Sequence, residues 1–407
     1  MSDTKIPARM LYLVGGTGNA ERVDVSDLFA NRLACLGLEI EYVIFDLNTS
    51  PAWRITTWHG ARTYVVGRSR YEGLTGSVIN KLIEIAADFR TFWIALTGTY
   101  DVIQVRDKFV IGVLGLLAAR LTKAKFVYWL SYPYAECRVL DANEKRARVP
   151  WLSLLGGRVA GWLLYKVIMP NADHIFVQSK QMLQDVALEG IPEKLMSPVP
   201  MAVSEKLLEH PPAMVEPNTI LYLGTLLRVR RLDVLIECLG IVRQRHPDAR
   251  LIFVGDGDCP EDRIFLEAVS RRLQLSDAVE YTGMIPMAEA HERVARAAVC
   301  VSPFYPTPIL QSTSPTKLSE YMALGRPVVA NTHPEQSVII AESQAGICVD
   351  WSAKAFAEAI ITLLDDPTAA ENMGALGREY VRKHRIYPVI ARDVAAQYRS
   401  LLGVGDC

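Results

Sequence analysis

Residues 218–257 read NTILYLGTLLRVRRLDVLIECLGIVRQRHPDARLIFVGDG. The first and last segments are short apolar runs that end at glycine turns, which is typical of buried strands. Between them, residues 231–246 space their apolar side chains as an amphipathic helix does. A strand, a helix and a second strand in this order predict two parallel strands joined by a crossover helix.

The same alternation continues in both directions along the chain. Strand-like runs recur at residues 279–284, 299–304 and 346–350 and at the end of the stretch 314–329, and before them at 9–16, 39–47, 63–67, 101–106, 125–131 and 174–179. Helical patterns separate most of these runs. Apolar strands that alternate with helices predict parallel sheets covered on both faces. We therefore expect an α/β protein with two doubly wound, Rossmann-like domains that face each other across a cleft.

The domain boundary is predicted from a change in pattern. Residues 192–218 are rich in proline and lack clean periodicity, so they are the best linker candidate. We expect an amino-terminal domain at residues 1–200 and a carboxyl-terminal domain at 201–386. The last helical pattern, at about residues 387–402, is expected to pack back onto the first domain or to stay with the second.

Composition excludes several classes of protein. The 407 residues carry a formal net charge of −1, which argues against a nucleic-acid binder. The seven cysteines show no zinc spacing, and the amino terminus does not resemble a signal peptide. No run reaches the roughly 18 uncharged apolar residues of a membrane-spanning helix. We expect a cytoplasmic protein without an essential metal or cofactor.

One segment of the first domain is basic and apolar at once. Between Gln104 and Lys166 there are eleven Lys or Arg and four Asp or Glu residues. Within it, residues 143–166 combine Lys145, Arg146 and Arg148 with Trp and Leu side chains. A cationic rim beside an aromatic face is typical of a helix that lies on anionic lipid. A buried core helix is the alternative. The first interpretation predicts peripheral attachment to the inner face of the plasma membrane.

Ligands of open parallel sheets bind beyond the carboxyl ends of the strands. There the first strand is followed by GGTGN (residues 15–19), a partial phosphate-binding turn. With Asp46 after the second strand, this turn keeps a nicotinamide-dependent oxidoreductase open as an alternative. Arg106 follows another strand at the same edge, where we expect it to contact an acceptor.

Charge order marks two loops of the second domain. Arg228, Arg230 and Arg231 precede a helix start, where cations oppose the helix dipole. In SPTKLSEYMALGRPVV (314–329), Ser314 is the predicted N-cap, Lys317 lies in the first turn and Glu320 follows one turn later. A sequence selected for helix stability would place the acid first. Both arrangements become favourable if an anion such as a diphosphate binds there.

These motifs resemble the family-4 retaining glycosyltransferases of the two-domain GT-B fold. The match runs in order through YLGTLLRVRRLDVLIE, RLIFVGDGD, VEYTGMIP, VCVSPF, SPTKLSEYMALGRPVVAN and AGICV, over residues 218–350. The first domain matches only through GGTGN and the order of strands and helices. The resemblance implies that the second domain holds a nucleotide-diphosphate sugar and the first presents a saccharide or lipid-linked acceptor.

The resemblance also implies roles for individual residues. Glu320 binds ribose, Arg230 and Lys317 meet the diphosphate, and these three form the expected catalytic set. The expected substrate-binding residues are Gly16, Thr17, Gly18, Arg106, Arg228, Ile285, Ser312, Thr313, Ser314, Thr316, His333 and Glu335. Of these, His333 and Glu335 are expected to contact the sugar from the NTHPEQ loop (331–336).

Two positions depart from the family pattern. Ser312 stands where the family carries a second Glu that contacts the sugar, and Thr225 stands where it carries Arg. Arg228 is the candidate to replace that Arg. We expect a hexosyltransferase of surface polysaccharide or glycolipid synthesis that uses a UDP- or GDP-sugar. Because of Ser312, a non-catalytic, membrane-associated partner that keeps the fold is a further alternative.

Overall fold

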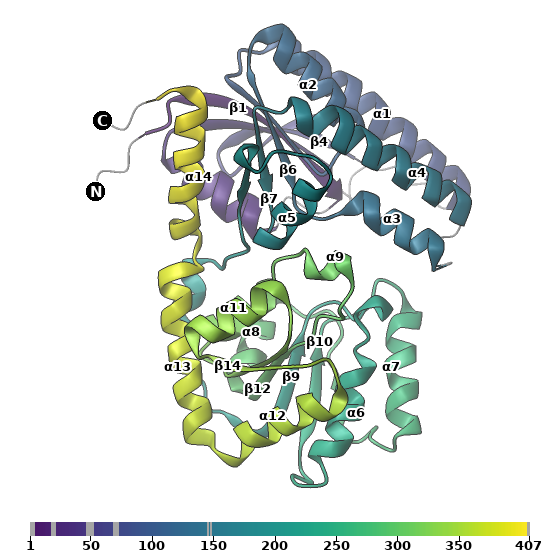
Figure 1. Ribbon diagram of the computed structural model, residues 1–407, viewed down its shortest axis with the longest axis vertical. Helices are drawn as coiled ribbons and strands as arrows, with labels where there is room; N and C mark the ends of the chain where they lie inside the picture. Colours follow the sequence, from purple (N-terminus) through teal and green to yellow (C-terminus); the bar gives the residue numbers. More distant parts are fainter. Residues whose placement is uncertain are drawn as a thin grey trace. The chain divides into compact units, whose positions relative to one another are not determined.

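The computed structural model describes residues 5–17, 22–45, 53–67, 73–144, 146 and 149–404. The chain forms two compact units, which we call unit 1 (residues 1–200 and 387–407) and unit 2 (residues 201–386). Figure 1 colours the chain from its amino to its carboxyl terminus. Each unit is built on one sheet with its own buried apolar core.

Unit 1 contains an eight-stranded sheet in the order β3-β4-β2-β1-β5-β6-β7-β8. Its strands are β1 (Ala8–Thr17), β2 (Leu38–Phe45), β3 (Arg54–Trp58), β4 (Ala61–Val66), β5 (Val102–Arg106), β6 (Lys125–Leu130), β7 (His174–Val177) and β8 (Met196–Pro198). All neighbouring strands run parallel except β3, which pairs antiparallel with β4. All five residues of β5 are buried, as expected for a central strand covered on both faces.

Helices cover this sheet. They are the π-helix η2 (Asp24–Leu33), α1 (Gly73–Thr97), α2 (Val110–Thr122), α3 (Tyr134–Asn143), α4 (Pro150–Trp162), η3 (Leu163–Ile168), η4 (Met169–Asn171), α5 (Lys180–Leu188), η5 (Glu193–Leu195) and α14 (Tyr387–Leu402). Helix α1 packs on α2, and α3 packs on α4 (Figure 1). The last helix, α14, packs against η2, and its Tyr398 hydroxyl donates to Gln104 of β5.

No uncharged apolar run reaches membrane-spanning length, as expected, but one apolar helix of unit 1 reaches that length with charged residues inside it. Residues Pro150–Asn171 form one helical run of 22 residues that is long and apolar enough to cross a membrane by length and composition. A third of its most apolar window is buried inside the structure. Arg158 and Lys166 lie within this run, so it contains no stretch of 18 uncharged residues.

Unit 2 contains a six-stranded, all-parallel sheet in the order β11-β10-β9-β12-β13-β14. Its strands are β9 (Glu216–Leu223), β10 (Arg250–Val254), β11 (Val279–Tyr281), β12 (Ala297–Ser302), β13 (Val328–Asn331) and β14 (Gly346–Val349). The stretch that opened the sequence analysis forms β9, α6 and β10 as predicted. The strand order reverses beside β9, which is where open parallel sheets bind ligands.

The helices of unit 2 alternate with these strands. They are η6 (Glu205–Glu209), η7 (Arg228–Arg230), α6 (Asp233–Val242), α7 (Pro260–Arg272), α8 (Met287–Arg296), α9 (Pro308–Gln311), α10 (Thr316–Ala323), α11 (Pro334–Ser343), α12 (Ala353–Asp365) and α13 (Pro367–His384). Helix α6 packs against α7 and α12, and α13 packs against α10 and α11. The predicted fold class of two parallel-sheet α/β domains is confirmed.

The predicted linker at residues 192–218 is largely structured. Its first part adds the three-residue strand β8 to unit 1, its middle contains η6, and its last residues begin β9. Elements of three to five residues are too short to show a period, so the sequence pattern could not indicate them.

Candidate functional site

The candidate site begins at the turn that ends β9. Gly224 has a φ of +137°, a left-handed conformation that favours glycine. Its amide donates to the carbonyl of Val254 at 2.8 Å, so the ends of β9 and β10 lie against each other. A Cβ atom at Gly224 would lie 3.3 Å from the Lys317 Nζ atom. The glycine therefore lets this lysine reach the end of the strand.

Lys317 lies in the first turn of α10 and crosses to β9. Its Nζ atom donates to the Tyr222 hydroxyl at 3.1 Å and faces the rings of Tyr222 and Phe304, at 4.7 and 5.4 Å from their centroids. Burial, and then repulsion from Arg230, lowers the pKa of Lys317 well below its ordinary value. The rings of Tyr222 and Phe304, which we call the aromatic cradle, hold the ammonium group in place. They supply no negative charge that would neutralise this group.

Arg230 supplies the second cation of this cluster. Its Nε atom is buried and has no hydrogen-bond partner among the described residues. Its guanidinium group interacts with the Tyr222 hydroxyl and raises the electrostatic cost of charging Lys317. Two neighbouring cations with an unmet donor are costly in a ligand-free protein. The arrangement is favourable if an anion binds between them.

Glu320 lies one turn after Lys317 on α10 and is half-buried. Burial raises the pKa of Glu320, and the neighbouring Lys317 opposes this shift. In the part of the chain that the structure describes, no cation lies within ion-pair distance of this carboxylate. Glu320 is therefore available to accept hydrogen bonds from a ligand.

The other two arginines of the η7 loop have protein partners. Arg231 forms an ion pair with Asp233 at 3.2 Å. The exposed Arg228 places its guanidinium group 4.4 Å from the centroid of the Phe265 ring. Of three cations that the charge pattern singled out, only Arg230 reaches the cluster with Lys317.

The predicted N-cap role of Ser314 is wrong. Helix α10 begins at Thr316 without a side-chain cap. The Ser314 hydroxyl instead accepts from the Met201 amide at 2.9 Å and donates to Glu335 at 3.0 Å. Glu335 in turn forms an ion pair with Arg385 at 2.5 Å. This network joins α10 and α11 to the segment at residues 200–202, which the sequence could not reveal.

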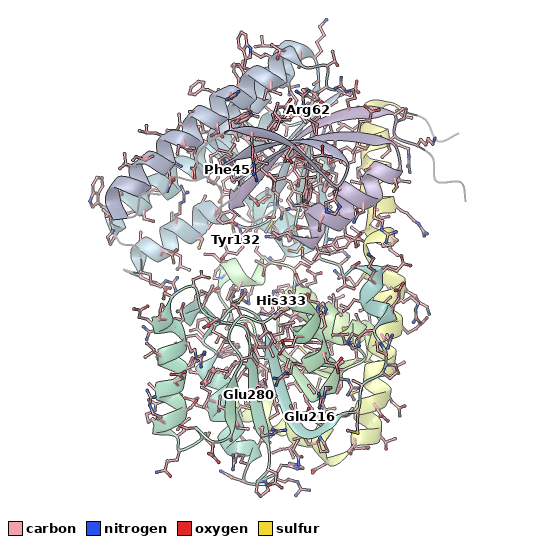
Figure 2. All side chains as sticks on the ribbon, turned by 180° about the vertical axis from the view of Figure 1, so that it is seen from behind. Phe45, Arg62, Tyr132, Glu216, Glu280 and His333 are labelled. Atoms are coloured by element: carbon pink, nitrogen blue, oxygen red, sulfur yellow. The ribbon has the colours of Figure 1, made fainter. Side chains whose placement is uncertain are left out.

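The structure also corrects the predicted sugar contact of His333. Its side chain is 1% exposed and caps α11, where Nδ1 accepts from the amides of Glu335 and Gln336. Nε2 donates to the carbonyl of Leu310 at 3.1 Å. Burial lowers the pKa of His333 to about 4, so the ring is neutral at pH 7. Figure 2 shows His333 at the end of the unit 2 sheet opposite Glu216.

The Glu335 carboxylate is held by Ser314 and Arg385, and its contact with the sugar stays a prediction. Ser312 is buried at the end of α9, and Thr313 donates its hydroxyl to the Leu310 carbonyl at 2.7 Å. Thr316 and Ile285 are half-buried. No interaction of these last two residues with a ligand is tested, so their roles stay predictions.

In unit 1, the structure corrects the predicted acceptor contact of Arg106. Its side chain is fully buried, with Nη2 at 2.7 Å from Asp24 and Nε at 3.4 Å from Asp107. Although burial raises it, the pKa of Asp24 lies below its ordinary value because of Arg106 and then Arg22. Arg106 thus closes a buried ion network where we expected an acceptor contact.

Part of the first loop lies outside the described residues. Gly16 and Thr17 end β1, and nothing further is described for their side chains. Gly18 and Asp46 fall outside the described ranges. Across those ranges, no group of three or more His, Cys, Asp or Glu side chains is placed to hold a metal ion.

Tyr222 and Phe304, which form the aromatic cradle of Lys317, were not predicted as site residues from the sequence. The only available signal was a tyrosine in a buried strand, since a buried hydroxyl needs a hydrogen-bond partner. That signal does not indicate which residue is the partner.

Known families match most of the chain. The family "Glycosyl transferases group 1" matches residues 217–366, and "Glycosyl transferase 4-like domain" matches residues 25–202. The phosphatidyl-myo-inositol mannosyltransferase of Mycobacterium tuberculosis (strain CDC 1551 / Oshkosh) is 27% identical over 198 residues, 46% of this chain and 48% of the relative. The match thus spans about half the length of that relative.

Other matches extend over nearly the whole chain. The D-inositol 3-phosphate glycosyltransferase of Corynebacterium glutamicum (strain R) is 22% identical over 386 residues, 90% of this chain and 89% of the relative. Among solved structures, sucrose-phosphate synthase from Thermosynechococcus elongatus superimposes with a TM-score of 0.71 at 20% identity, covering 98% of this chain and all of that one. At this identity the likeness shows the fold alone. With both family matches and this fold, the chain belongs to the family-4 glycosyltransferases of the GT-B fold.

Proposed function

We propose that this protein is a hexosyltransferase that uses a nucleotide-diphosphate sugar, UDP- or GDP-linked, as its donor. The observation that carries the proposal is the cluster of Arg230 and Lys317. These cations lie close enough for Arg230 to lower the pKa of Lys317, and the Arg230 Nε atom has no partner in the described part of the chain. A diphosphate supplies the missing negative charge.

The cluster is suited to the departure of the nucleoside diphosphate. When the bond between the sugar and the diphosphate breaks, negative charge develops on the leaving group. Fixed cations in a partly buried site stabilise such charge without reorganisation, and this is usually the largest contribution to catalysis. In this proposal Arg230 and Lys317 neutralise the leaving group, so no metal is required.

Glu320 is proposed to bind the ribose hydroxyls of the donor. Its half-buried carboxylate lies one helical turn from Lys317, and a carboxylate accepts hydrogen bonds from two neighbouring hydroxyls. Arg228, Ile285 and Thr316, together with Gly16, Thr17 and Gly18, stay predictions as further donor contacts. Retention of the anomeric configuration is part of the proposal and rests on family membership.

The acceptor is proposed to be a saccharide or a lipid-linked saccharide of surface polysaccharide or glycolipid synthesis. Several relatives are named as mannosyltransferases, one of phosphatidyl-myo-inositol and one of phosphatidylinositol monomannoside. A structural neighbour, HepE of Anabaena, has been solved in complex with UDP and glucose at 15% identity and a TM-score of 0.69. These names support the class of donor and acceptor that we propose.

Donor binding can be tested by thermal shift with UDP-, GDP- and ADP-sugars. We expect one of them to stabilise the protein, by about 2.7 kcal/mol at a concentration of 100 Kd. Glu320→Gln should weaken this donor by roughly 10- to 100-fold, because a hydrogen bond to a charged group contributes about 1.5–3 kcal/mol. The donor titration measures both effects.

The matched control is Glu358→Gln, which changes an exposed carboxylate of α12 in the same unit. It should bind the donor as the unchanged protein does. Without donor, Glu320→Gln should unfold at a temperature no lower than that of the unchanged protein, because burial disfavours the charged form of Glu320. Full donor affinity in Glu320→Gln would show that Glu320 does not bind ribose, and no stabilisation by any sugar nucleotide would contradict the proposed function.

We further propose that unit 1 lies peripherally on an anionic membrane through residues 143–166. Trp151, Leu155 and Trp162 on α4 are 68%, 54% and 60% exposed, and only Gly157 and Ala160 of this helix are buried. This exposure argues against a core helix. Arg158 and Lys166 are exposed on the same run, whereas Arg146 is paired with Asp141 and Glu144. Lys145 and Arg148 lie outside the described residues.

Vesicle sedimentation tests this surface. The protein should bind phosphatidylglycerol vesicles, and Trp151→Ser with Trp162→Ser should lower this affinity by at least about tenfold, since burying one large apolar side chain contributes about 1.5–3 kcal/mol. Leu376→Ser, which changes a leucine of α13 that is 51% exposed, is the control. Equal binding by the double variant would contradict a membrane role. So would an unchanged protein that is dimeric in solution and a double variant that is monomeric, because the apolar face would then be a subunit interface.

Neither alternative function is favoured by an observation. A nicotinamide-dependent oxidoreductase required Gly18 and Asp46, which lie outside the described residues, and the family match argues against it. A non-catalytic partner was suggested by Ser312, which is buried at the end of α9. Sugar release from the stabilising donor distinguishes an enzyme from such a partner.

A further inference from the structure

Unit 1 contains a pocket that the donor site does not use. It has a volume of about 380 Å³ and lies among α1, α2, α3 and α4. Asp107, Lys108, Phe109 and Val110 line it, and these four residues directly follow β5. The pocket therefore opens at the carboxyl end of a central strand, the edge at which parallel sheets bind ligands. Phe45, beside this pocket, and Arg62 lie toward opposite ends of the unit 1 sheet in Figure 2.

The walls of the pocket are mainly apolar, with Phe109 and Val110 from the start of α2 and Val159, Ala160 and Leu163 from α4 and η3. The polar end holds Lys108, whose Nζ atom lies 3.5 Å from Asp88 and 3.4 Å from the centroid of the Phe45 ring.

Burial shifts the pKa values of the two residues at the polar end toward their neutral forms. Burial lowers the pKa of Lys108 and raises the pKa of Asp88, although each residue opposes the shift of the other. The other titratable groups that line the pocket are Lys81, Glu84, Asp107, Tyr134 and Arg138. Lys81 is paired with Glu84 at 2.9 Å, and Asp107 accepts from the Ser131 amide at 2.7 Å. Arg138 places its guanidinium group 5.9 Å from the centroid of the Phe109 ring. The other charges of the lining are paired within the protein, and the apolar walls suit an apolar ligand.

The mouth of the pocket joins an exposed apolar surface. Val110 and Val159 line the pocket and are nevertheless 45% and 49% exposed. On α1, exposed apolar side chains recur every three or four residues, which places them on one face beside the pocket-lining residues Lys81, Glu84 and Asp88. They are Val78, Leu82, Ile85, Phe89 and Trp93. With the exposed face of α4, this stripe places apolar surface on both sides of the mouth.

Gly156 provides the space of the pocket on α4. A Cβ atom at Gly156 would meet nothing within 4 Å, although the residue lines the pocket. The adjacent Gly157 differs, because its Cβ atom would lie 2.9 Å from the Ala135 carbonyl oxygen of α3. Close packing of α3 and α4 accounts for Gly157 but not for Gly156. A glycine in a helix interior lowers helix stability. Gly156 lies in such an interior without a packing reason.

We propose that this pocket binds the hydrocarbon chain of a lipid-linked acceptor. The chain enters from the apolar surface between α1 and α4, and the head group remains at the carboxyl end of β5. The identity of the ligand as the acceptor rests on the proposed function, whereas the binding of a hydrocarbon chain rests on the pocket itself. Membrane contact through α4 brings the mouth to the lipid but does not require the pocket.

Calorimetry with dodecyl phosphate below its micelle concentration tests the proposal. The full-length protein should bind dodecyl phosphate, and inorganic phosphate should not compete. Gly156→Phe places an aromatic ring in the pocket. The Cβ atom that carries this ring has no neighbour within 4 Å, so the substitution fits the backbone. It should weaken binding by at least about tenfold, because the ring displaces two or more buried methylene groups.

Two variants of unit 1 serve as controls. Gly156→Ala adds one methyl group and at least the gain in helix propensity that Gly156→Phe brings, and Leu188→Phe adds a ring at an exposed position of α5, away from the pocket and from α4. Both should bind dodecyl phosphate within about twofold of the unchanged protein. All variants should keep the same thermal shift with the donor sugar nucleotide, which shows that unit 2 is intact. Dodecyl phosphate binding without any donor binding would support the pocket while contradicting the proposed function.

Three results would overturn the proposal. The first is no binding of dodecyl phosphate by the unchanged protein. The second is equal binding by Gly156→Phe. The third is full competition by inorganic phosphate, which would show that the site recognises the anion and not the chain.

Discussion

Lys317→Met is expected to lower turnover of the donor sugar by roughly 10²- to 10³-fold, the cost of removing one preorganised charged group from a site where charge develops. Met keeps the length of the side chain and its contacts with Tyr222 and Phe304 but carries no charge. Steady-state kinetics with the donor that stabilises the protein measure the effect. The matched control is Lys354→Met on α12, an exposed lysine of the same unit.

The same variant should be at least as stable as the unchanged protein when no donor is present. Because burial and Arg230 lower the pKa of Lys317, the folded state disfavours its charged form. Removing the charge removes this cost, so the unfolding temperature should not fall and is expected to rise. Loss of turnover together with a lower unfolding temperature would instead indicate a structural role.

The pH dependence of donor binding follows from the same shift. Only the protonated Lys317 neutralises a phosphate, so donor affinity should decrease as pH rises through the lowered pKa of this residue. Bound diphosphate favours the protonated form, and donor binding should therefore take up protons in this range. Lys317→Met should show neither effect. A pH-independent donor affinity in the unchanged protein would show that Lys317 does not contact the diphosphate.

Arg106→Met is expected to lower the free energy of unfolding of unit 1 by about 3–5 kcal/mol, the range observed when one partner of a buried ion pair is removed. The carboxylates of Asp24 and Asp107 would remain buried with their main cation missing. Denaturant unfolding followed by tryptophan fluorescence is suitable, since the Arg106 guanidinium group lies 5.8 Å from the centroid of the buried Trp129 ring.

A double variant separates this network effect from a packing defect. Arg106→Met with Asp24→Asn removes both charges of the closest pair, so it should be more stable than Arg106→Met alone. The donor-induced thermal shift of unit 2 should be unchanged in both variants. Wild-type stability in Arg106→Met, combined with a loss of acceptor use, would restore the prediction that Arg106 contacts the acceptor.

The local sequence pattern was sufficient to predict a strand or helix wherever the burial of its residues follows a regular period. The runs that became β5, β9 and β10 are apolar because both faces of a central parallel strand are covered, and the helix at residues 233–242 shows its period because one face is buried. Strand β3 was not predicted for the converse reason. Four of its five residues are exposed, so it lacks an apolar run.

Charge order along the chain also singled out two cations that the fold brings together. Arg230 and Lys317 were singled out because cations at helix starts oppose the helix dipole. Arg231 showed the same pattern, yet it is neutralised by Asp233. A charge pattern indicates that an anion is missing, but it does not show whether the protein or a ligand supplies that anion.

The sequence by itself determined the two α/β folds, the order of their elements and the pair of cations in unit 2. Only the tertiary structure decided the partners of individual polar residues. Arg106 meets Asp24, Ser314 meets Met201 and Glu335 meets Arg385, and the two members of each pair are 82, 113 and 50 residues apart in the chain. Secondary structure follows from the burial of near neighbours, which leaves a period in the sequence. A buried polar group is satisfied by whichever partner the packed fold brings to it, and such a pairing leaves no local pattern.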